Sequence, residues 1–219
     1  MKIQIISLFP EMFAGVLNAS MLWKAQERKI VSYEIINLRD FGLGPRHQVD
    51  DTPYGGGDGM LLKPDPLVAA IEQAKANDSG ALVVLPTPRG QVYKQAAAKL
   101  LATRKGLILI CPRYEGYDDR VTQWVDEQYC IGNYILTGGE LPVMIIIDSV
   151  VRLLPGVLGG ATSAEIESFQ ENDKNIEFPQ YTRPEKFRGH KVPPVLLSGN
   201  HAAIAKWRQA HGRKSGLSH

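Results

Sequence analysis

Strand-like and helix-like segments alternate along the first 150 residues, and this order restricts the fold more than any other feature. Short apolar runs predict strands at 2–8, 31–38, 81–85, 106–111 and 128–136. Helical patterns lie between them, at 10–28, 64–76, 91–103 and 118–127. Segment 141–154 fits a buried strand or a buried helix, and its length and flanking prolines favour a helix. The alternation predicts an α/β fold with a mostly parallel sheet.

The length and residue content exclude several classes of protein. A chain of 219 residues suits one or two small domains. The longest apolar run, 141–147, is far shorter than the roughly 20 residues that a membrane-spanning helix needs. The N-terminus does not resemble a signal peptide, and two cysteines cannot build a disulfide scaffold. We therefore expect a cytoplasmic protein that does not associate with membranes.

Basic residues are concentrated at the C-terminal end. Residues 183–219 carry a net charge of +7, which leaves −5 for residues 1–182 of a chain whose total is +2. Such an end can bind a polyanion, or it can be a solvated and partly disordered tail. Residues 156–178 show no sustained apolar pattern, and 199–211 reads as a short amphipathic helix. We predict a domain at 1–155, a flexible linker at 156–178 and a small basic helical domain at 179–219.

Three loops follow predicted strands at their carboxyl ends, at 85–90, 111–116 and 131–142. Ligands of open α/β sheets bind beyond these strand ends. Glycine and proline are also common in ordinary turns, so a single loop of this kind would carry little information. Three on successive strands favour a small-molecule cleft.

The densest glycine cluster lies at 54–59. It matches neither a P-loop nor a dinucleotide-binding fingerprint. It could be a lid, a cradle for an RNA backbone or a plain surface loop, and the neighbouring Arg46, His47, Asp50 and Asp51 favour a function. His47 has no second histidine at ligand spacing, so we expect no metal site. Neither cysteine has a histidine nearby in sequence, and no serine-nucleophile motif occurs, so the sequence does not support nucleophilic catalysis.

Several motifs, in this order along the chain, resemble the bacterial tRNA (guanine-N1)-methyltransferase (TrmD) family of the SPOUT superfamily. They run from residue 7 to about residue 208, nearly the whole chain. The most specific are Tyr-Gly-Gly-Gly-x-Gly-Met at 54–60 and Pro-Pro-Val-Leu-Leu-Ser-Gly-Asn-His at 193–201. Shorter matches include Arg-Tyr-Glu-Gly at 113–116, Leu-Thr-Gly-Gly-Glu-Leu at 136–141 and Pro-Gly-Val-Leu-Gly at 155–159.

The resemblance implies methylation of N1 of the guanosine that follows the anticodon (position 37), with S-adenosylmethionine as the methyl donor. It also implies a deep trefoil knot formed by the three loops, and a homodimer with its sites at the interface. The family suggests that Mg²⁺ assists, although no ligand cluster is visible in this sequence. By likeness, the residues that contact the donor are Leu85, Pro86, Thr87, Pro88, Gly90, Pro112, Arg113, Tyr114, Glu115, Gly116, Ile131, Gly132, Asn133, Tyr134, Ile135, Leu136, Gly139 and Pro142.

The chemistry needs a base and a cation. Guanine N1 is a poor nucleophile until its proton leaves, and the negative charge then develops on O6. By likeness the base is Glu167, where the family has aspartate, and the cation is Arg152. Glu165 and Asp173 are alternative carboxylates. Pro112 stands where the family usually has glycine, so a backbone N–H is lost there.

The basic C-terminal end would then bind the anticodon arm. Asn200 and His201 could touch the RNA or could equally cap the helix after Gly199. A non-catalytic RNA-binding homologue and a nucleotide-dependent enzyme of doubly wound type are the alternatives. The residues expected to bind tRNA are Arg183, Lys186, Arg188, Lys191, Asn200, His201, Lys206 and Arg208.

Overall fold

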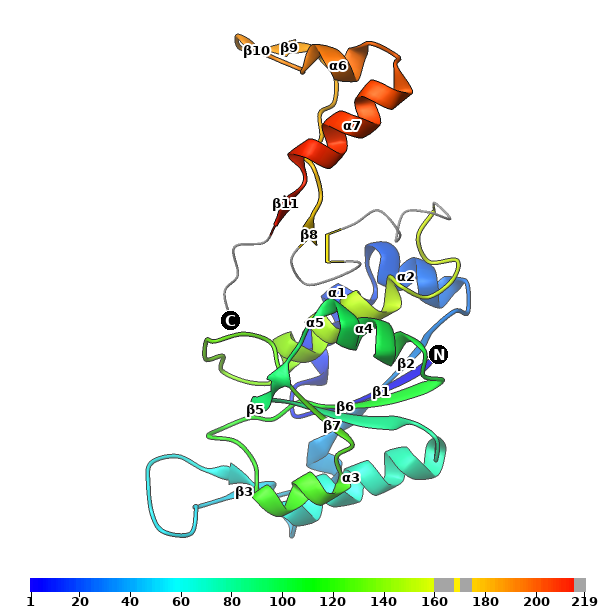
Figure 1. Cartoon of the computed structure of the whole chain (residues 1–219). Coiled ribbons are helices and arrows are strands. Elements are labelled where there is room, and N and C mark those ends of the chain that lie inside the picture. Colours follow the sequence, from blue (N-terminus) through cyan, green and yellow to red (C-terminus); the bar gives the residue numbers. More distant parts are fainter. Residues whose placement is uncertain (160–167, 170–174, 215–219) are drawn as a thin grey trace. The chain divides into compact units, whose positions relative to one another are not determined.

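The computed structural model describes residues 1–159, 168–169 and 175–214. The chain divides into two compact units, Met1–Gly159 and Gly160–His219, and each is considered by itself (Figure 1). Glu165, Glu167 and Asp173, the predicted base and its two alternatives, lie outside the described residues.

Five strands form the sheet of the N-terminal unit, in the order β2-β1-β6-β5-β7 with every pair parallel. All five residues of β6 are buried, as expected for a central strand covered on both faces. The predicted α/β architecture is therefore confirmed. The strands are β1 (Lys2–Ser7), β2 (Ser32–Asn37), β5 (Leu82–Val92), β6 (Gly106–Ile110) and β7 (Glu127–Cys130).

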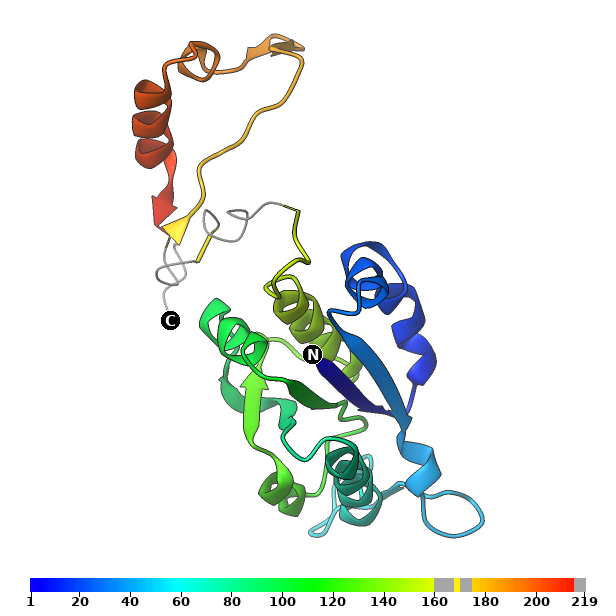
Figure 2. The ribbon, with the colours of Figure 1, turned by 90° about the vertical axis from the view of Figure 1, so that its right-hand side faces the viewer.

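Helices cover both faces of this sheet, as the two views in Figures 1 and 2 show. Successive side chains of a strand point to opposite faces, so Leu107 and Ile108 of β6 belong to different hydrophobic clusters. One cluster packs against α1 (Ala14–Leu17), α2 (Ser20–Glu27) and α5 (Glu140–Val151). The other packs against α3 (Pro64–Asn77) and the 3-10 helix η3 (Asp119–Trp124). The sheet is therefore packed on both faces, and the loops that follow its strands are anchored to a rigid core.

The predicted helix at 10–28 is wrong as one element. It consists of the 3-10 helix η1 (Pro10–Phe13), then α1, then α2. Ala19 is extended and Ser20 has a φ of 52° between α1 and α2. Asn18 and Ser20 belong to the residue types whose side chains favour helix ends over helix interiors, which fits a break at this point.

Three other boundaries differ from the prediction. Strand β5 continues through Pro86 to Val92, with a register shift against β7 between Pro86 and Gln91, so α4 begins only at Gln95 and ends at Ala102. The segment predicted as a helix at 118–127 is the shorter η3, whose first turn is capped by the Asp118 side chain. Strand β7 ends at Cys130, well before residue 136. The helix favoured at 141–154 is confirmed as α5.

The segment 39–59, which lies between the predicted strand at 31–38 and the predicted helix at 64–76, is partly ordered. It begins inside the 3-10 helix η2 (Leu38–Phe41) and later contains the short strand β3 (Asp50–Asp51). Strand β3 pairs antiparallel with β4 (Leu61–Leu62), so the glycine cluster is the connection of a hairpin.

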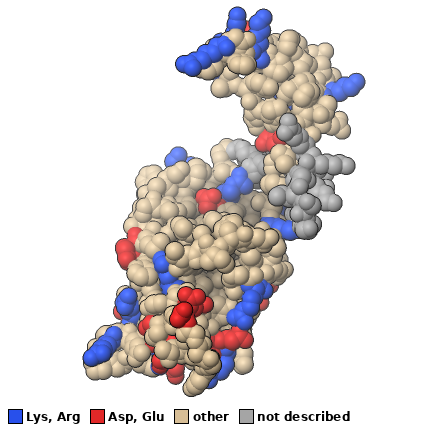
Figure 3. Space-filling view, turned by 90° about the vertical axis from the view of Figure 1, so that its left-hand side faces the viewer, with Lys and Arg blue, Asp and Glu red and all other residues tan. Residues whose placement is uncertain are grey.

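The C-terminal unit is small. Its elements are β8 (Asn175–Ile176), β9 (Lys186–Phe187), β10 (His190–Lys191), α6 (Pro194–Leu197), α7 (His201–His211) and β11 (Arg213–Lys214). Trp207 of α7 packs edge-on against Phe178 and Tyr181 and stacks on His211. Lys and Arg side chains gather at the end of this unit that carries β9 and β10 (Figures 1 and 3).

No helix in the described part of the chain is long and apolar enough to cross a membrane. The trefoil knot and the domain limits drawn from the sequence stay predictions.

Candidate functional site

A pocket of about 640 Å³ lies at the carboxyl ends of β5, β6 and β7, within the N-terminal unit. The segments that follow these strands line it, as the position of ligand sites in parallel sheets leads one to expect. Its volume falls in the range of roughly 300–1,000 Å³ typical of small-molecule sites. The sequence prediction of a cleft built by three loops therefore agrees with the structure.

Most residues predicted to contact the methyl donor line this pocket. They are Pro86, Thr87, Pro88, Pro112, Arg113, Tyr114, Glu115, Gly116, Ile131, Gly132, Tyr134, Ile135, Leu136, Gly139 and Pro142.

Three predicted residues do not line the pocket: Leu85, Gly90 and Asn133. Leu85 belongs to β5 and is fully buried in the hydrophobic core. Gly90 lies so close to β7 that a Cβ atom placed on it would come within 2.5 Å of the Tyr129 backbone nitrogen. The close packing of β5 against β7 therefore explains why residue 90 is glycine, and no ligand is needed to explain it.

Sequence reasoning missed several lining residues, of which Arg89 and Gly138 lie inside the three loops that it identified and the others lie outside them. Leu61 comes from β4, which no pattern in the sequence indicated. Tyr117 and Tyr129 are aromatic residues next to the predicted loops, a signal that could have found them. The missed residues are Leu61, Arg89, Tyr117, Tyr129, Cys130 and Gly138.

A buried polar cluster joins the loops of the pocket. The Nε atom of Arg113 lies 2.7 Å from Oε2 of Glu140, the first residue of α5. The Ser7 hydroxyl, at the end of β1, donates a hydrogen bond of 2.8 Å to Oε1 of the same carboxylate and accepts one of 2.9 Å from the Phe9 N–H. The Arg113 guanidinium also lies over the Phe9 ring, 4.5 Å from its centroid. Two separate segments are thus tied to the carboxylate of a third.

Gly139 brings the backbones of two pocket loops together. Its N–H donates a 2.7 Å hydrogen bond to the Pro112 carbonyl. A Cβ atom on Gly139 would overlap Pro112 Cδ and come within 2.7 Å of Cys111 Cα. The position accepts only glycine without movement of the backbone.

Burial raises the pKa of the Cys111 thiol well above its ordinary value, and the neighbouring Glu140 carboxylate adds to the shift. A raised pKa keeps the thiol protonated. Cys111 is therefore a packing residue of the polar cluster, and its thiol is a poor nucleophile.

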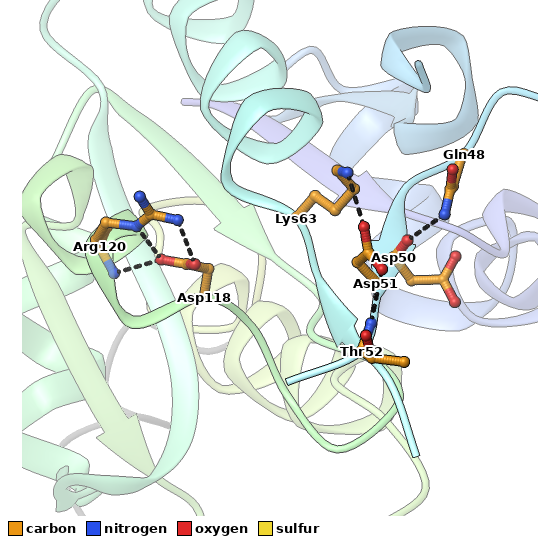
Figure 4. Close-up of polar contacts among 7 residues, drawn as sticks. All are labelled: Gln48, Asp50, Asp51, Thr52, Lys63, Asp118 and Arg120. Carbon is orange, nitrogen blue, oxygen red and sulfur yellow. Dashed lines mark hydrogen bonds and ion pairs between the residues drawn. The ribbon is translucent and has the colours of Figure 1, made fainter. Parts of the chain in front are cut away.

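The hairpin β3–β4 brings the glycine-rich loop to the edge of this pocket. Its base is fastened by the ion pair between Lys63 Nζ and Asp51 Oδ2, at 3.1 Å, which holds the pKa of the Asp51 carboxyl below its ordinary value (Figure 4). The Glu115 N–H donates a 3.0 Å hydrogen bond to the Met60 carbonyl. Gly59 has a φ of +83°, and a Cβ there would collide with the Glu115 side chain. The tip itself is open, with Tyr54 fully exposed.

At the start of η3, Asp118 and Arg120 form a two-pronged ion pair, with both contacts at 2.8 Å (Figure 4). This pair lowers the pKa of the Asp118 carboxyl. Leu62 and Asp118 are joined by a backbone hydrogen bond of 2.9 Å, so β4 and the start of η3 are connected.

Arg152, the predicted cation, does not line the pocket. It follows the last residue of α5, whereas Pro142, near the start of that helix, does line it. Ten residues of α-helix span about 15 Å. One face of α5 carries Leu141, Ile145, Asp148 and Arg152, of which the first three are exposed and Arg152 is half-buried.

The residues predicted to bind tRNA lie in the C-terminal unit, and their side chains are exposed. Arg183 precedes the β9–β10 hairpin, which carries Lys186, Arg188 and Lys191. Asn200 caps α7, because its side chain accepts a 3.1 Å hydrogen bond from the Ala203 N–H. Of the two roles left open for Asn200, the capping role is therefore present.

The other three predicted residues lie on α7. His201 is its first residue, and Lys206 and Arg208 are exposed near its middle and end. The Arg208 guanidinium lies 4.9 Å from the centroid of the Phe178 ring. The described residues contain no group of three or more His, Cys, Asp or Glu placed to hold a metal ion.

Comparison with known proteins gives one consistent match. The model of the family described as tRNA (Guanine-1)-methyltransferase TrmD matches residues 1–217. Proteins named tRNA (guanine-N(1)-)-methyltransferase from Geobacillus kaustophilus and Carboxydothermus hydrogenoformans are each 52% identical to this chain over 210 residues. The match covers 95% of this chain and 85% and 81% of those proteins.

A solved structure agrees with these matches. The crystal structure of the tRNA (m1G37) methyltransferase from Aquifex aeolicus superposes with a TM-score of 0.80 at 35% identity. The match covers 96% of this chain and 88% of that one.

Proposed function

Because this chain belongs to the tRNA (guanine-N1)-methyltransferase family, we propose that its pocket binds S-adenosylmethionine and that the enzyme methylates the guanosine following the anticodon. The observation that carries the proposal is the pocket at the ends of β5, β6 and β7, lined by fifteen of the eighteen residues expected to contact the donor. Unmodified tRNA is the second substrate, and the enzyme works where tRNA does, in the cytoplasm.

The residues present suit this donor. Proline and leucine side chains form apolar walls, while the turns at Gly116 and Gly132 expose backbone groups that can read an adenosine edge. The Glu115 carboxylate suits a hydroxyl or cationic group of the ligand. S-adenosylmethionine, when bound, supplies a methyl group on a sulfonium cation, which needs no metal to activate it.

Two residues of the dimeric enzyme, Glu167 and Arg152, prepare the guanine. Glu167 takes the N1 proton, a contribution that general bases make at about 10²–10⁴-fold. The Arg152 guanidinium then stabilises the negative charge on O6 as it develops. The loops tied to Glu140 align the methyl carbon with N1, and this alignment is the fold's largest contribution to the reaction.

The enzyme acts as a homodimer. Helix α5, which carries the exposed Leu141 and Ile145, contacts η1, which carries the exposed Met12 and leads into α1 with the exposed Val16. We infer that these side chains form an apolar surface that a second copy would cover. A two-fold axis through the exposed face of α5 pairs two antiparallel helices. Arg152 of the partner subunit then approaches the Pro142 end of this chain's helix, where the pocket lies.

The basic C-terminal unit binds phosphates of the anticodon arm. Counterion release makes this binding salt-sensitive, with log K falling by about 0.9 per phosphate contact for each decade of salt.

The test is transfer of labelled methyl from S-adenosylmethionine to unmodified tRNA, with and without Mg²⁺. The expected product is N1-methylguanosine at the position after the anticodon. A matched tRNA with adenosine at that position should take up no label. Absence of label from the guanosine tRNA, after its folding has been verified, would contradict the proposal.

A further inference from the structure

The β9–β10 hairpin presents two different faces. Its turn residues, Arg188 and Gly189, have φ of +46° and +91°, the pattern of a tight type I′ turn. Phe187 pairs with His190, and Lys186 pairs with Lys191. Neighbouring residues of a strand point to opposite faces, so one face carries two rings and the other carries two ammonium groups.

The lysine pair is unfavourable in the isolated protein. Like charges directly opposite each other on antiparallel strands repel. Lys186 and Lys191 are both exposed, and among the described residues the structure shows no ion pair between either of them and the neighbouring Glu185, which by strand alternation belongs to the opposite face. An anion between or beside the two ammonium groups would remove the repulsion, so this face suits a phosphate.

The ring face is equally open. Phe187 is 61% exposed, and the Arg188 guanidinium carbon lies 5.4 Å from the centroid of its ring. A flat aromatic ring beside a guanidinium, next to cations that hold phosphates, is the arrangement that proteins use to stack an unpaired base.

We propose that Phe187 is a stacking platform for one unpaired base of the tRNA, while Lys186 and Lys191 bind the neighbouring phosphates. This inference rests on the proposed function, since it takes tRNA as the ligand. An enzyme that reaches guanine N1 must turn that base out of its stack. A neighbouring loop base that loses its stacking partner gains a replacement on Phe187.

The test measures the dissociation constant of tRNA for Phe187→Ala, Phe187→Leu and Phe187→Trp over a range of salt concentrations. We expect Phe187→Ala to weaken binding by about 5- to 150-fold, the range for loss of one base–aromatic contact. Phe187→Leu should be nearly as weak because it keeps apolar volume without a ring, and Phe187→Trp should bind like the wild type. The salt slope should not change, because no phosphate contact is lost. Leu197→Ala, which truncates an exposed apolar side chain on α6, is the matched control and should leave binding unchanged.

The lysine face gives the complementary result. The double variant Lys186→Gln and Lys191→Gln should lower the salt slope by roughly 1.4 to 1.8, the amount expected for two phosphate contacts. An unchanged slope would overturn the phosphate half of the proposal.

Abasic substitution identifies the stacked base. When each unpaired base of the anticodon loop is removed in turn, one abasic tRNA should bind the wild type and Phe187→Ala equally. Wild-type affinity in Phe187→Leu or in Phe187→Ala would overturn the stacking proposal. So would dissociation of an oligomer in Phe187→Ala, because it would assign the ring to a protein contact. These outcomes are separate from a failure of the proposed function, which would show as a wild-type enzyme that transfers no methyl group to tRNA.

Discussion

The guanidinium of Arg113 and the carboxylate of Glu140 form an ion pair of 2.7 Å although Glu140 is only 1% exposed. Arg113 follows β6 and Glu140 begins α5, so the pair joins two of the three loops that line the pocket. The Ser7 hydroxyl satisfies the other carboxylate oxygen. A buried charge of this kind is tolerated only while its partner is present.

Glu140→Gln should therefore destabilise the protein by about 3–5 kcal/mol, the usual cost of leaving one charge of a buried pair uncompensated. Chemical denaturation measures the free energy of unfolding. Glu72→Gln, on the exposed side of α3, is the control and should change it by less than about 0.5 kcal/mol. Equal stabilities of the two variants would show that the pair does not hold the loops.

The ring of Tyr93 gives a prediction for alkaline pH. Burial raises the pKa of its hydroxyl, which lies 2.7 Å from the Ser149 hydroxyl, to about 12. The unfolded chain loses this proton near pH 10 and the folded chain near pH 12, so the stabilisation is complete below pH 10 and is lost as the pH rises. Between pH 9 and pH 12 the wild type should lose about 2–3 kcal/mol of unfolding free energy more than Tyr93→Phe. Parallel losses in the two proteins would contradict this assignment.

Arg152→Ala should reduce turnover by about 10²–10³-fold and leave donor affinity nearly unchanged, because in the proposed mechanism the guanidinium acts on charge that develops during the reaction. Steady-state kinetics and calorimetry with S-adenosylhomocysteine separate the two effects. An equal fall in donor affinity would place Arg152 in the donor site.

The proposed dimer gives a second prediction for Arg152→Ala. Mixing Arg152→Ala with a pocket variant such as Gly139→Ala should restore about a quarter of wild-type activity, since half the dimers are mixed and each has one intact site. Failure to restore activity, with mixed dimers verified, would mean that each site uses its own Arg152.

Glu167→Gln should lower transfer by about 10²–10⁴-fold without weakening tRNA binding, because only the proton acceptor is lost. Glu167→Asp carries the family's residue and should remain active. If Glu167→Gln keeps its activity, then Glu165 or Asp173 becomes the candidate base, and the same assay on Glu165→Gln and Asp173→Asn decides between them.

The sequence pattern correctly predicted those strands and helices that depend mainly on the residues within the segment itself. The apolar run of β6 and the proline-initiated helix α3 were correctly placed, because burial and the N-terminal proline act within each segment. The break between α1 and α2 was missed, because Asn18 and Ser20 can also lie in a helix interior exposed to solvent. The continuation of β5 past Pro86 depends on pairing with β7, which no single segment reveals.

In the candidate site, too, the sequence revealed features within one loop but not contacts between distant segments. The glycines and prolines of the three loops were visible in the sequence and, apart from Gly90, line the pocket. The partnership of Ser7 with Glu140 was not, because 133 residues separate them and the contact exists only once the sheet has formed. Leu61 was missed for a similar reason, since β4 is only two residues long and is ordered by pairing with β3.

The most direct test of the central claim is calorimetric titration of the wild type, Gly139→Ala and Gly159→Ala with S-adenosylhomocysteine. A methyl group on Gly139 would press on the Pro112 and Cys111 backbone, whereas one on Gly159 would meet nothing within 4 Å. We predict saturable binding in the wild type and in Gly159→Ala, and at least about tenfold weaker binding in Gly139→Ala, which corresponds to 1.4 kcal/mol. No binding by the wild type, or undiminished binding by Gly139→Ala, would contradict the claim that this pocket holds the methyl donor.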